Sequence, residues 1–538
     1  MSIFTDIEKA FKKIKERFSP LQQWAFVAVM VIGLIAHGYI IFNRISYHDN
    51  TACLFSLGAT YELGRWGLGV IYDLQIFTTR TFAVPVFNGI LSMIFIALSA
   101  SKMVRIFDIK SKVSAVIIGA IMIAYPVVPS IFSFMFTSWP YFLGLLLAVK
   151  AAEIIVSETA FDKYEGAARL VLRVLVSAIV LALSLSMYQA FFAVTISIVL
   201  IRLLQDVLTD RIDTVKGYAK NGFTYLVTLG MGLGIWAAVA AIFKKLKGID
   251  TMDYKGMGKG YDLSQFPARL SQCIREFFSG SYAGVNGLKY LRLLTLCVIL
   301  ATVIHIFILI IKKNVGIGVK LSAIVGAALL PVGMNVMYIL STSDDYFVDS
   351  LMVYGTAFVL ILPIILIETL DFEVFKQAIA EKLIKLITCL QLIAIFVITV
   401  SYIYLDNAAY LKADIAERQA TSYFTQLAAN IKSCQGFDDD MEIVFVDFDK
   451  NADGTFVTVD DNEELDAIKI EKFPVYSDLV TYGSAIRFMQ EHCGFGNERV
   501  VVDDGTLAKE ESVQAMPTYP DYGSIAVVDG KLIVKFGE

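Results

Sequence analysis

The sequence predicts an α-helical protein that crosses a membrane eleven times and carries a small α/β domain at its C-terminal end. Three observations support this fold class. Of the 538 residues, 57% are hydrophobic and only 18% are charged, whereas soluble domains are less apolar and more charged. The mean hydropathy is +0.64. Apolar residues form runs close to the roughly 20 residues that a bilayer-crossing helix needs, and charge becomes frequent only near the C-terminal end.

Each membrane helix is predicted from one apolar run. The eleven runs lie at residues 21–42, 84–101, 113–129, 139–156, 170–187, 189–204, 223–243, 291–311, 316–339, 351–369 and 386–405. The fifth and sixth runs almost touch, so we expect a tight turn at residues 187–189. The middles of the runs contain essentially no Asp, Glu, Lys or Arg. This argues against an ion-coupled transporter, which places such groups near the midplane.

Lysine and arginine predict the orientation of the helices. They cluster in the N-terminal arm and in alternate loops, whereas the short loops 130–138 and 340–350 contain none. Because basic loops stay on the cytoplasmic side, we expect a cytoplasmic N-terminus. With eleven helices, the C-terminus is then expected outside.

Three regions follow from these patterns. Residues 1–20 are expected to form an amphipathic helix on the cytoplasmic leaflet, since apolar residues recur there every three or four positions. Residues 21–405 are expected to form the membrane domain, with large outer loops at 43–83 and 244–290. Residues 406–538 are expected to form an extracytoplasmic α/β domain.

The pattern of the last region also predicts its elements. Helices and buried strands are expected, in chain order, at 407–433, 442–447, 477–491 and 500–503. A hairpin is expected at 524–536, with Asp529-Gly530 as its turn. Cys434 and Cys493 lie in this region, and their spacing leaves a disulfide and two free thiols as equal alternatives.

The composition argues against several classes of function. The net charge is only −5, so no nucleic-acid partner is indicated. The 4 His and 6 Cys show neither CxxC nor HxxxH spacing, which argues against a zinc or thiol-redox site.

Polar and aromatic residues gather at the outer ends of the predicted helices. They occur in five segments, at residues 46–50, 61–67, 137–140, 186–189 and 341–346. The predicted topology puts all five on one face of the membrane, where an enzyme would build an extracytoplasmic active site.

These segments also have purely structural explanations. Trp and Tyr at a membrane boundary belong to the usual aromatic belt. Residues 48–50 suit a helix N-cap cluster, and residues 344–345 suit a solvated loop tip. Glu62 and Arg65 suit an ordinary i, i+3 ion pair on a helix.

The residue types suit sugar transfer from a lipid phosphate. An inverting transfer needs one carboxylate, which takes the proton of the acceptor hydroxyl as that oxygen attacks the anomeric carbon. A lipid phosphate leaves as a stable anion, so the site needs a cation and no general acid. Asp49 lies just after the first predicted helix, and Arg65 follows in the same outer loop.

Lysines of the second large outer loop have two predicted roles. Lys244, Lys245 and Lys247 are expected to contact anionic headgroups. Lys255 and Lys259, on a glycine-rich segment, are expected to close over a phosphate or a glycan.

Short motifs resemble a known family. An aspartate after the first helix (Asp49), Gly64-Arg65-Trp66 and Tyr188-Gln189 resemble the bacterial glucosyltransferases of the serotype-converting, O-antigen-modifying Gtr type. Residues 407–411, 516–520 and 523–525 are similar to that family as well. The resemblance implies a GT-C-like helical fold in the bacterial cytoplasmic membrane, with the active site and the C-terminal domain outside.

The resemblance also implies the substrates and the site. The donor would be a polyprenyl-phosphate-linked sugar, typically undecaprenyl-phosphate glucose, and the acceptor an envelope polysaccharide, a teichoic-type polymer or a lipid-linked repeat unit. By the resemblance, Asp49 would be the catalytic base. From the residue types and their positions, Arg65, with His48 or Lys255, is expected to bind the donor phosphate. The residues expected to bind sugar or acceptor are Asn50, Tyr61, Glu62, Trp66, Trp139, Tyr188, Gln189, Asp344 and Asp345.

The need for a divalent cation, Mg²⁺ or Mn²⁺, stays open. Many relatives carry two acidic residues where this chain has Asp49-Asn50, and an amide is a poorer ligand than a carboxylate for a hard cation. Asp344 or Asp345 would have to supply the missing oxygen.

Two other functions compete with the transferase. A transporter or flippase for a lipid-linked sugar predicts internal symmetry and a polar path through the bundle. A non-catalytic envelope assembly protein predicts that function survives replacement of Asp49 and is abolished by removal of residues 406–538.

Overall fold

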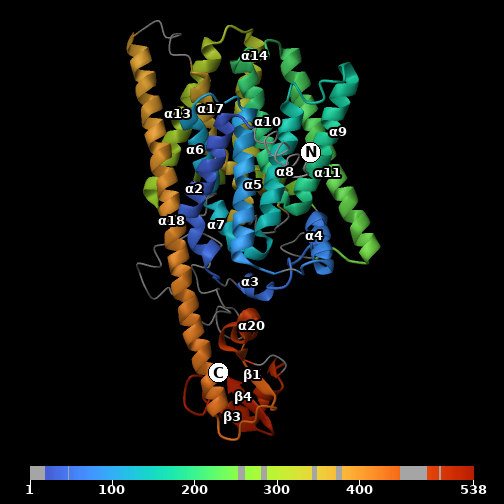
Figure 1. The fold of residues 1–538 in the computed structure, drawn as a ribbon, viewed down its shortest axis with the longest axis vertical. Helices are drawn as coiled ribbons and strands as arrows, with labels where there is room; N and C mark the ends of the chain where they lie inside the picture. Colours follow the sequence, from blue (N-terminus) through green and yellow to red (C-terminus); the bar gives the residue numbers. More distant parts are fainter. Residues whose placement is uncertain are drawn as a thin grey trace, which may run out of the picture. The chain divides into compact units, whose positions relative to one another are not determined.

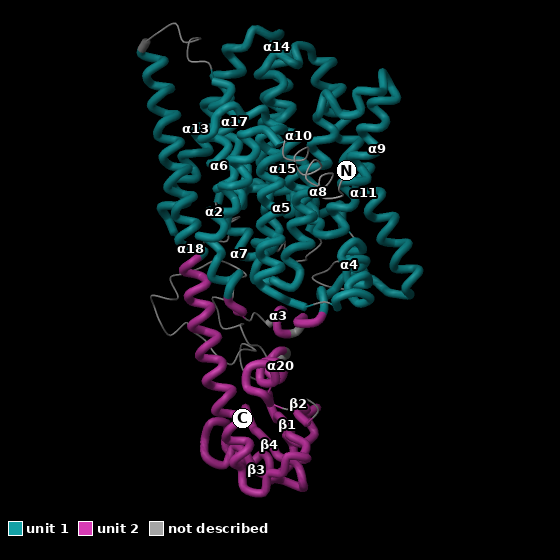
Figure 2. The backbone as a smooth tube through the Cα atoms, viewed as in Figure 1, with its two compact units in different colours: residues 1–42, 56–406 teal, residues 43–55, 407–538 magenta. Residues whose placement is uncertain are grey.

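The computed structural model of the chain divides into two compact units (Figure 2). It describes residues 18–45, 48–80, 82–252, 261–279, 288–341, 348–370, 378–448, 482–495 and 499–537, without the side chains of His48, Ala52, Ala378, Tyr482 and Gly483. Unit 1 comprises residues 1–42 and 56–406, and unit 2 comprises residues 43–55 and 407–538. Unit 2 thus includes residues 43–55, a short segment of the first predicted outer loop, which the sequence analysis assigned to the membrane domain.

Unit 1 is a bundle in which long helices run side by side (Figure 1). Nine helices in the described ranges are long and apolar enough to cross a membrane. They are built on α2 (Pro20–Phe42), α5 (Pro85–Ile106), α8 (Ser138–Val156), α9 (Gly166–Met187), α10 (Phe192–Leu208), α11 (Val215–Lys247), α13 (Lys289–Lys312), α14 (Ile317–Ala328) and α18 (Ala378–Ser433). Two shorter apolar helices, α6 (Lys112–Ala124) and α17 (Phe358–Thr369), lie in the other two predicted runs. The helical membrane fold is confirmed, whereas the number of crossings and the orientation stay predictions.

Short elements connect or extend these helices. In unit 1 they are η1 (Tyr61–Leu63), α4 (Trp66–Phe77), α7 (Val127–Phe132), η2 (Met135–Thr137), η3 (Gln189–Phe191), η4 (Leu263–Gln265), α12 (Phe266–Ser279), α15 (Leu330–Met334), α16 (Met337–Leu340), η6 (Ser350–Met352) and η7 (Tyr354–Ala357). Proline explains one break inside a predicted run. Tyr125 is extended because Pro126 follows, so α6 ends at Ala124. Tyr188 is also extended, and it forms the expected tight turn between α9 and η3.

Small residues let the helices of unit 1 approach closely. A Cβ atom on Gly33 would lie 2.9 Å from Cγ1 of Ile123, and one on Gly119 would lie 2.8 Å from the carbonyl oxygen of Ala25. Hydroxyl groups add bonds between helices, as where Ser184 Oγ of α9 donates to the carbonyl of Gly144 in α8 at 2.7 Å. Such contacts stabilise bundles in lipid, where helix association gains little from the hydrophobic effect.

Unit 2 contains a four-stranded sheet in the order β2-β1-β4-β3. The central strand β1 (Ile443–Val446) is parallel to β2 (Val500–Val502) on one side and to β4 (Lys531–Lys535) on the other. The edge strand β3 (Ile525–Val528) is antiparallel to β4. The four residues of β1 are buried on both faces, as expected for the central strand of a mostly parallel sheet.

Helices cover both faces of this sheet. On one face, Phe424 of α18 and Phe488 of α20 (Tyr482–Cys493) pack against Ile443 and Phe445. On the other face, the segment with η11 (Leu507–Lys509) and α21 (Glu511–Gln514) packs through Val513 against alternate strand residues.

The predicted elements of the C-terminal region are confirmed where the structure describes them. The hairpin turns at Asp529 and Gly530, which have φ angles of 46° and 78°, as a type I′ turn requires. Cys434 and Cys493 are free thiols, which decides between the two alternatives for this pair. The predicted helix at residues 1–20 lies almost entirely outside the described residues.

Candidate functional site

Arg65 of unit 1 is held by two stacked tyrosines. It immediately precedes α4, and its backbone N–H donates to the carbonyl of Thr60 at 2.9 Å. Its Nη1 atom donates to the hydroxyl of Tyr141 at 2.8 Å. The guanidinium carbon lies 5.6 Å from the ring centroid of Tyr141 and 5.5 Å from that of Tyr188, within cation–π distance of both. The two rings stack with centroids 4.3 Å apart.

The charge of Arg65 is not compensated within the described part of the chain. No carboxylate there forms an ion pair with it, and its Nε atom is buried without a hydrogen-bond partner there. Arginine stays charged at any physiological pH, and its planar fork of N–H groups matches the oxygens of phosphate or carboxylate. The site therefore suits an oxyanion, and a phosphodiester attached to a lipid has the required chemistry.

The turn that carries Arg65 is fixed to α11. Trp236 Nε1 donates to the carbonyl of Gly64 at 2.9 Å, and Trp66 Nε1 donates to the carbonyl of Trp236 at 3.3 Å. Gly64 has a φ angle of 69°, and a Cβ atom there would lie 3.0 Å from the ring of Trp236. Gln189 Nε2 donates to the carbonyl of Leu63 at 2.8 Å. These bonds preorganise the backbone on both sides of Arg65.

A second anchor joins α4 to the end of α11. Asp73 accepts hydrogen bonds from Tyr61 Oη and Lys247 Nζ, each at 2.7 Å. Burial opposes ionisation of Asp73, but these bonds and the Lys247 charge outweigh it and lower the pKa of the carboxyl group. Burial and the same hydrogen bond raise the pKa of Tyr61. Lys247, which we expected at lipid headgroups, thus pairs with a carboxylate.

The structure brings several of the predicted residues of unit 1 together around this turn. Tyr61, Trp66 and Gln189 use their polar atoms to hold it, so the sugar contacts expected of them stay predictions. Glu62 accepts a hydrogen bond from the backbone of Thr60 at 2.9 Å and does not form the i, i+3 ion pair with Arg65. Trp139 lies half-buried in the first turn of α8.

Sequence reasoning expected Tyr188 at the site but missed Tyr141, Trp236 and Asp73, which hold Arg65 or its turn. Tyr141 lies two positions after Trp139, in an apolar run where aromatic residues are expected to belong to the aromatic belt of the membrane boundary. Trp236 lies inside the apolar run of α11, and Asp73 carries no motif. Only the fold reveals that these three meet the turn at residues 61–66.

Asp49 and Asn50 belong to unit 2. They lie in the short helix α3 (His48–Ala52), which packs against α20. Asp49 is half-buried and Asn50 is buried. The segment is fixed by an ion pair between Arg44 and Glu491 and by the guanidinium of Arg487, 5.8 Å from the ring centroid of Phe55.

Other predicted site residues are not described. Lys255, Asp344 and Asp345 lie outside the described residues, and so does the side chain of His48. Within the described ranges, no three His, Cys, Asp or Glu side chains group in a way that would hold a metal ion. We therefore derive no step through a divalent cation.

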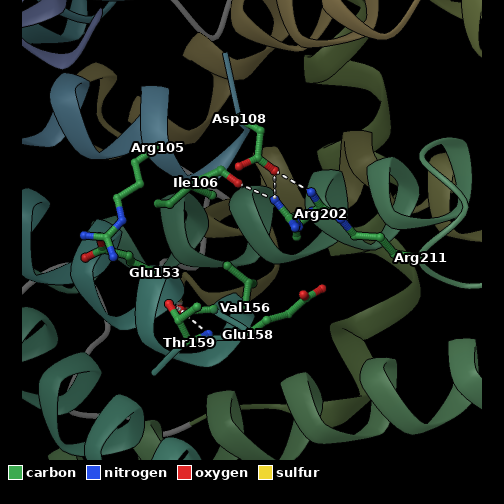
Figure 3. Close-up of a pocket in the computed structure, with 10 residues that line it drawn as sticks. Arg105, Ile106, Asp108, Glu153, Val156, Glu158, Thr159, Arg202 and Arg211 are labelled. Carbon is green, nitrogen blue, oxygen red and sulfur yellow. Dashed lines mark hydrogen bonds and ion pairs between the residues drawn. The ribbon is translucent and has the colours of Figure 1, made fainter. Parts of the chain in front are cut away.

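A contrasting charged cluster lies at another site of unit 1. Arg202 of α10 makes an ion pair of 2.8 Å with Asp206 and one of 3.2 Å with Asp108. Arg211 also reaches Asp108, at 2.8 Å, and Figure 3 shows this carboxylate bridging the two arginines. Arg202, Asp108 and Arg211 line a cavity of about 210 Å³. The two arginines are thus balanced by the carboxylates of Asp108 and Asp206, unlike Arg65. Nearby, Glu153 is ion-paired with Lys102, Lys150 and Arg105, at 3.2, 2.7 and 3.4 Å.

The fold and the site are those of a helical membrane protein in which a rigid turn holds an arginine that no described carboxylate neutralises. The family model of the glucosyl transferase GtrII family matches residues 38–364, more than half of the chain, and the chain therefore belongs to that family. The protein is thus a membrane glycosyltransferase, and the Gtr-type resemblance is confirmed. No curated protein and no solved structure matches the chain.

Proposed function

We propose that the protein transfers a sugar, glucose in the first instance, from a polyprenyl-phosphate donor to a cell-envelope glycan on the outer face of the bacterial cytoplasmic membrane, with inversion at the anomeric carbon. The family supports glucosyl transfer, because its model covers residues 38–364. The donor class is supported by one observation in particular, the uncompensated guanidinium of Arg65 within that range.

Arg65 has the features of a phosphate-binding group. Its neighbours Tyr141 and Tyr188 offer an acceptor hydroxyl and ring faces and no negative charge, so the guanidinium keeps its attraction for an anion. The backbone is fixed by Trp236 and Gln189, so little ordering is needed when substrate binds. During transfer the negative charge on the phosphate oxygen grows, and an arginine placed there stabilises the transition state more than the ground state.

The proposed reaction is a single displacement. The acceptor hydroxyl oxygen attacks the anomeric carbon and forms the new glycosidic bond. The bond from that carbon to the phosphate oxygen breaks, and its electron pair leaves with polyprenyl phosphate, next to Arg65. The hydroxyl proton passes to a carboxylate, for which Asp49 is our candidate by the family resemblance.

The test is sugar transfer by the purified full-length protein in lipid nanodiscs. Undecaprenyl-phosphate glucose is the donor and isolated envelope glycan the acceptor, and Asp49→Asn is compared with wild type. Asp250→Asn, which changes an exposed carboxylate, is the matched control. We expect wild-type transfer, an unchanged control, and a loss of at least about 10²-fold for Asp49→Asn.

Other outcomes would redirect the proposal. Full activity of Asp49→Asn would move the base to another carboxylate, Glu62 or the pair at residues 344–345. Failure of the wild type with every polyprenyl-linked sugar tested would reject the donor class and reopen the flippase and assembly alternatives. Movement of the labelled lipid across the bilayer without transfer would establish the flippase.

A further inference from the structure

The sheet of unit 2 has the topology of a ligand-binding α/β sheet. Between β1 and β2 the described helix is α20, which covers one face of the sheet, and between β2 and β3 lie η11 and α21, which cover the opposite face. The strand order therefore reverses between β1 and its parallel neighbour β4. In open α/β sheets, ligands bind outside the carboxyl ends of the strands at such a reversal.

A cavity lies at this place. Its volume is about 610 Å³, which is within the range of small-molecule sites. It is lined by Asp447, Ala508, Gln514, Met516, Pro517, Thr518, Asp521 and Lys535. Asp447 directly follows β1 and Lys535 ends β4, so the two strands at the reversal both contribute. Asp447 has a φ angle of 55°, a conformation that costs energy for a residue with a side chain.

The lining is rigid because Lys535 holds it. The side chain of Lys535 is only 8% exposed, and its Nζ atom donates to the carbonyls of Gln514 at 3.0 Å and Met516 at 2.8 Å. By donating to these two carbonyls, Lys535 caps the C-terminal end of α21. The lining therefore carries the ammonium group of Lys535 together with the carboxylates of Asp447 and Asp521, charges of both signs.

This set of groups selects a ligand class. Because charges of both signs line the cavity, no single sign of charge there selects an anion or a cation as the ligand. Carboxylate, amide and hydroxyl groups accept and donate hydrogen bonds to sugar hydroxyls, and Pro517 and Met516 offer an apolar surface to the C–H face of a sugar ring. A neutral saccharide matches all of these groups.

We propose that the cavity between the ends of β1 and β4 binds a saccharide segment of the acceptor glycan. This inference rests on the proposed function for the identity of the acceptor. The site itself is independent of the chemistry at Arg65, so it can be tested by binding alone.

The experiment measures binding of neutral oligosaccharides, released from envelope glycan, to the full-length protein in nanodiscs. Asp521→Asn and Thr518→Val remove polar partners from the cavity, and Asp447→Asn does so at the end of β1. Asp529→Asn is the control, because this carboxylate lies in the β3–β4 turn at the other end of β4. We expect each cavity variant to raise the dissociation constant about tenfold and the control to leave it unchanged.

Transfer assays separate this inference from the proposed function. With a short soluble glucoside as acceptor, the cavity variants should transfer sugar at the wild-type rate, while KM for polymeric glycan rises about tenfold. Unchanged oligosaccharide binding in all three cavity variants would overturn the inference, even if transfer occurs. Binding that depends on the cavity in a protein without transfer activity would uphold the site and reject the enzyme.

Discussion

Arg65 and Arg202 are both partly or fully withdrawn from water in unit 1, yet their surroundings differ in kind. Arg202 lies between Asp108 and Asp206, and its Nη1 atom donates a hydrogen bond to the backbone carbonyl of Ile106. Arg65 lies against Tyr141 and Tyr188, and none of its described neighbours supplies a carboxylate. A charge that the protein neutralises holds the protein together, whereas a charge that it supports without neutralising is available to a substrate.

The two arginines should respond to mutation in opposite ways. Removal of Arg202 should damage stability and spare the chemistry of the folded molecules, and removal of Arg65 should do the reverse.

Arg202→Met should destabilise the protein by about 3–5 kcal/mol, because it leaves the buried carboxylate of Asp206 without its main partner. Unfolding of the nanodisc-embedded protein by heat or denaturant measures the effect. Arg105→Met is the control, since Arg105 is 58% exposed and its ion pair with Glu153 contributes at most about 1 kcal/mol. Equal stabilities of the two variants would show that the Arg202 cluster is not a structural network.

Arg65→Ala should lower kcat/KM for the lipid-linked donor by about 10²–10³-fold, the loss typical of one transition-state donor. The melting temperature should change little, because no described carboxylate loses a partner. Arg292→Ala, at an exposed position in the first turn of α13, is the control. A collapse in stability with normal activity of the remaining folded protein would place Arg65 in the structural class with Arg202.

Tyr141→Phe should have a smaller effect on the same reaction. It removes the hydroxyl that accepts from Arg65 Nη1 and leaves the ring in place. A hydrogen bond to a charged group is worth about 1.5–3 kcal/mol, so kcat/KM should fall about 10- to 100-fold. Steady-state kinetics with varied donor measure this, and an unchanged value would mean that Tyr141 does not position Arg65.

Lys247→Met should have the smallest effect, about 0.2–1 kcal/mol, since both partners of the Lys247–Asp73 pair are more than one third exposed. Because the folded pKa of Asp73 is lowered, its stabilisation is present above the ordinary value of 3.8 and is lost as the pH falls below it. Unfolding at pH 7 and pH 3 should therefore show a difference between variant and wild type that shrinks at the lower pH. A constant difference would mean that Lys247 acts through packing against Tyr61.

Much of the fold could be predicted from the sequence, because hydrophobicity is a local signal. The apolar runs, the tight turn before Gln189 and the hairpin at Asp529-Gly530 each depend on neighbouring residues alone. The assignment of residues 43–55 could not be predicted, because it depends on Arg44 meeting Glu491, a partner far along the chain.

The candidate site was predictable only in part for the same reason. Arg65 stands out in the sequence as a cation in a predicted outer loop, but its supports Tyr141, Tyr188 and Trp236 come from three other helices or turns. Whether an arginine is neutralised depends on which carboxylates surround it in space. The sequence analysis therefore did not single out Arg202, although its ion pairs with Asp108 and Asp206 place it at the centre of a network.

The membership of residues 43–55 in unit 2 has a consequence for building chimeras between family members. A graft that exchanges only residues 407–538 would separate Arg44 from Glu491 and Phe55 from Arg487. Transplanting unit 2 therefore requires both pieces to be moved together, as one discontinuous module, while α4, α11 and the turn carrying Arg65 remain with the recipient.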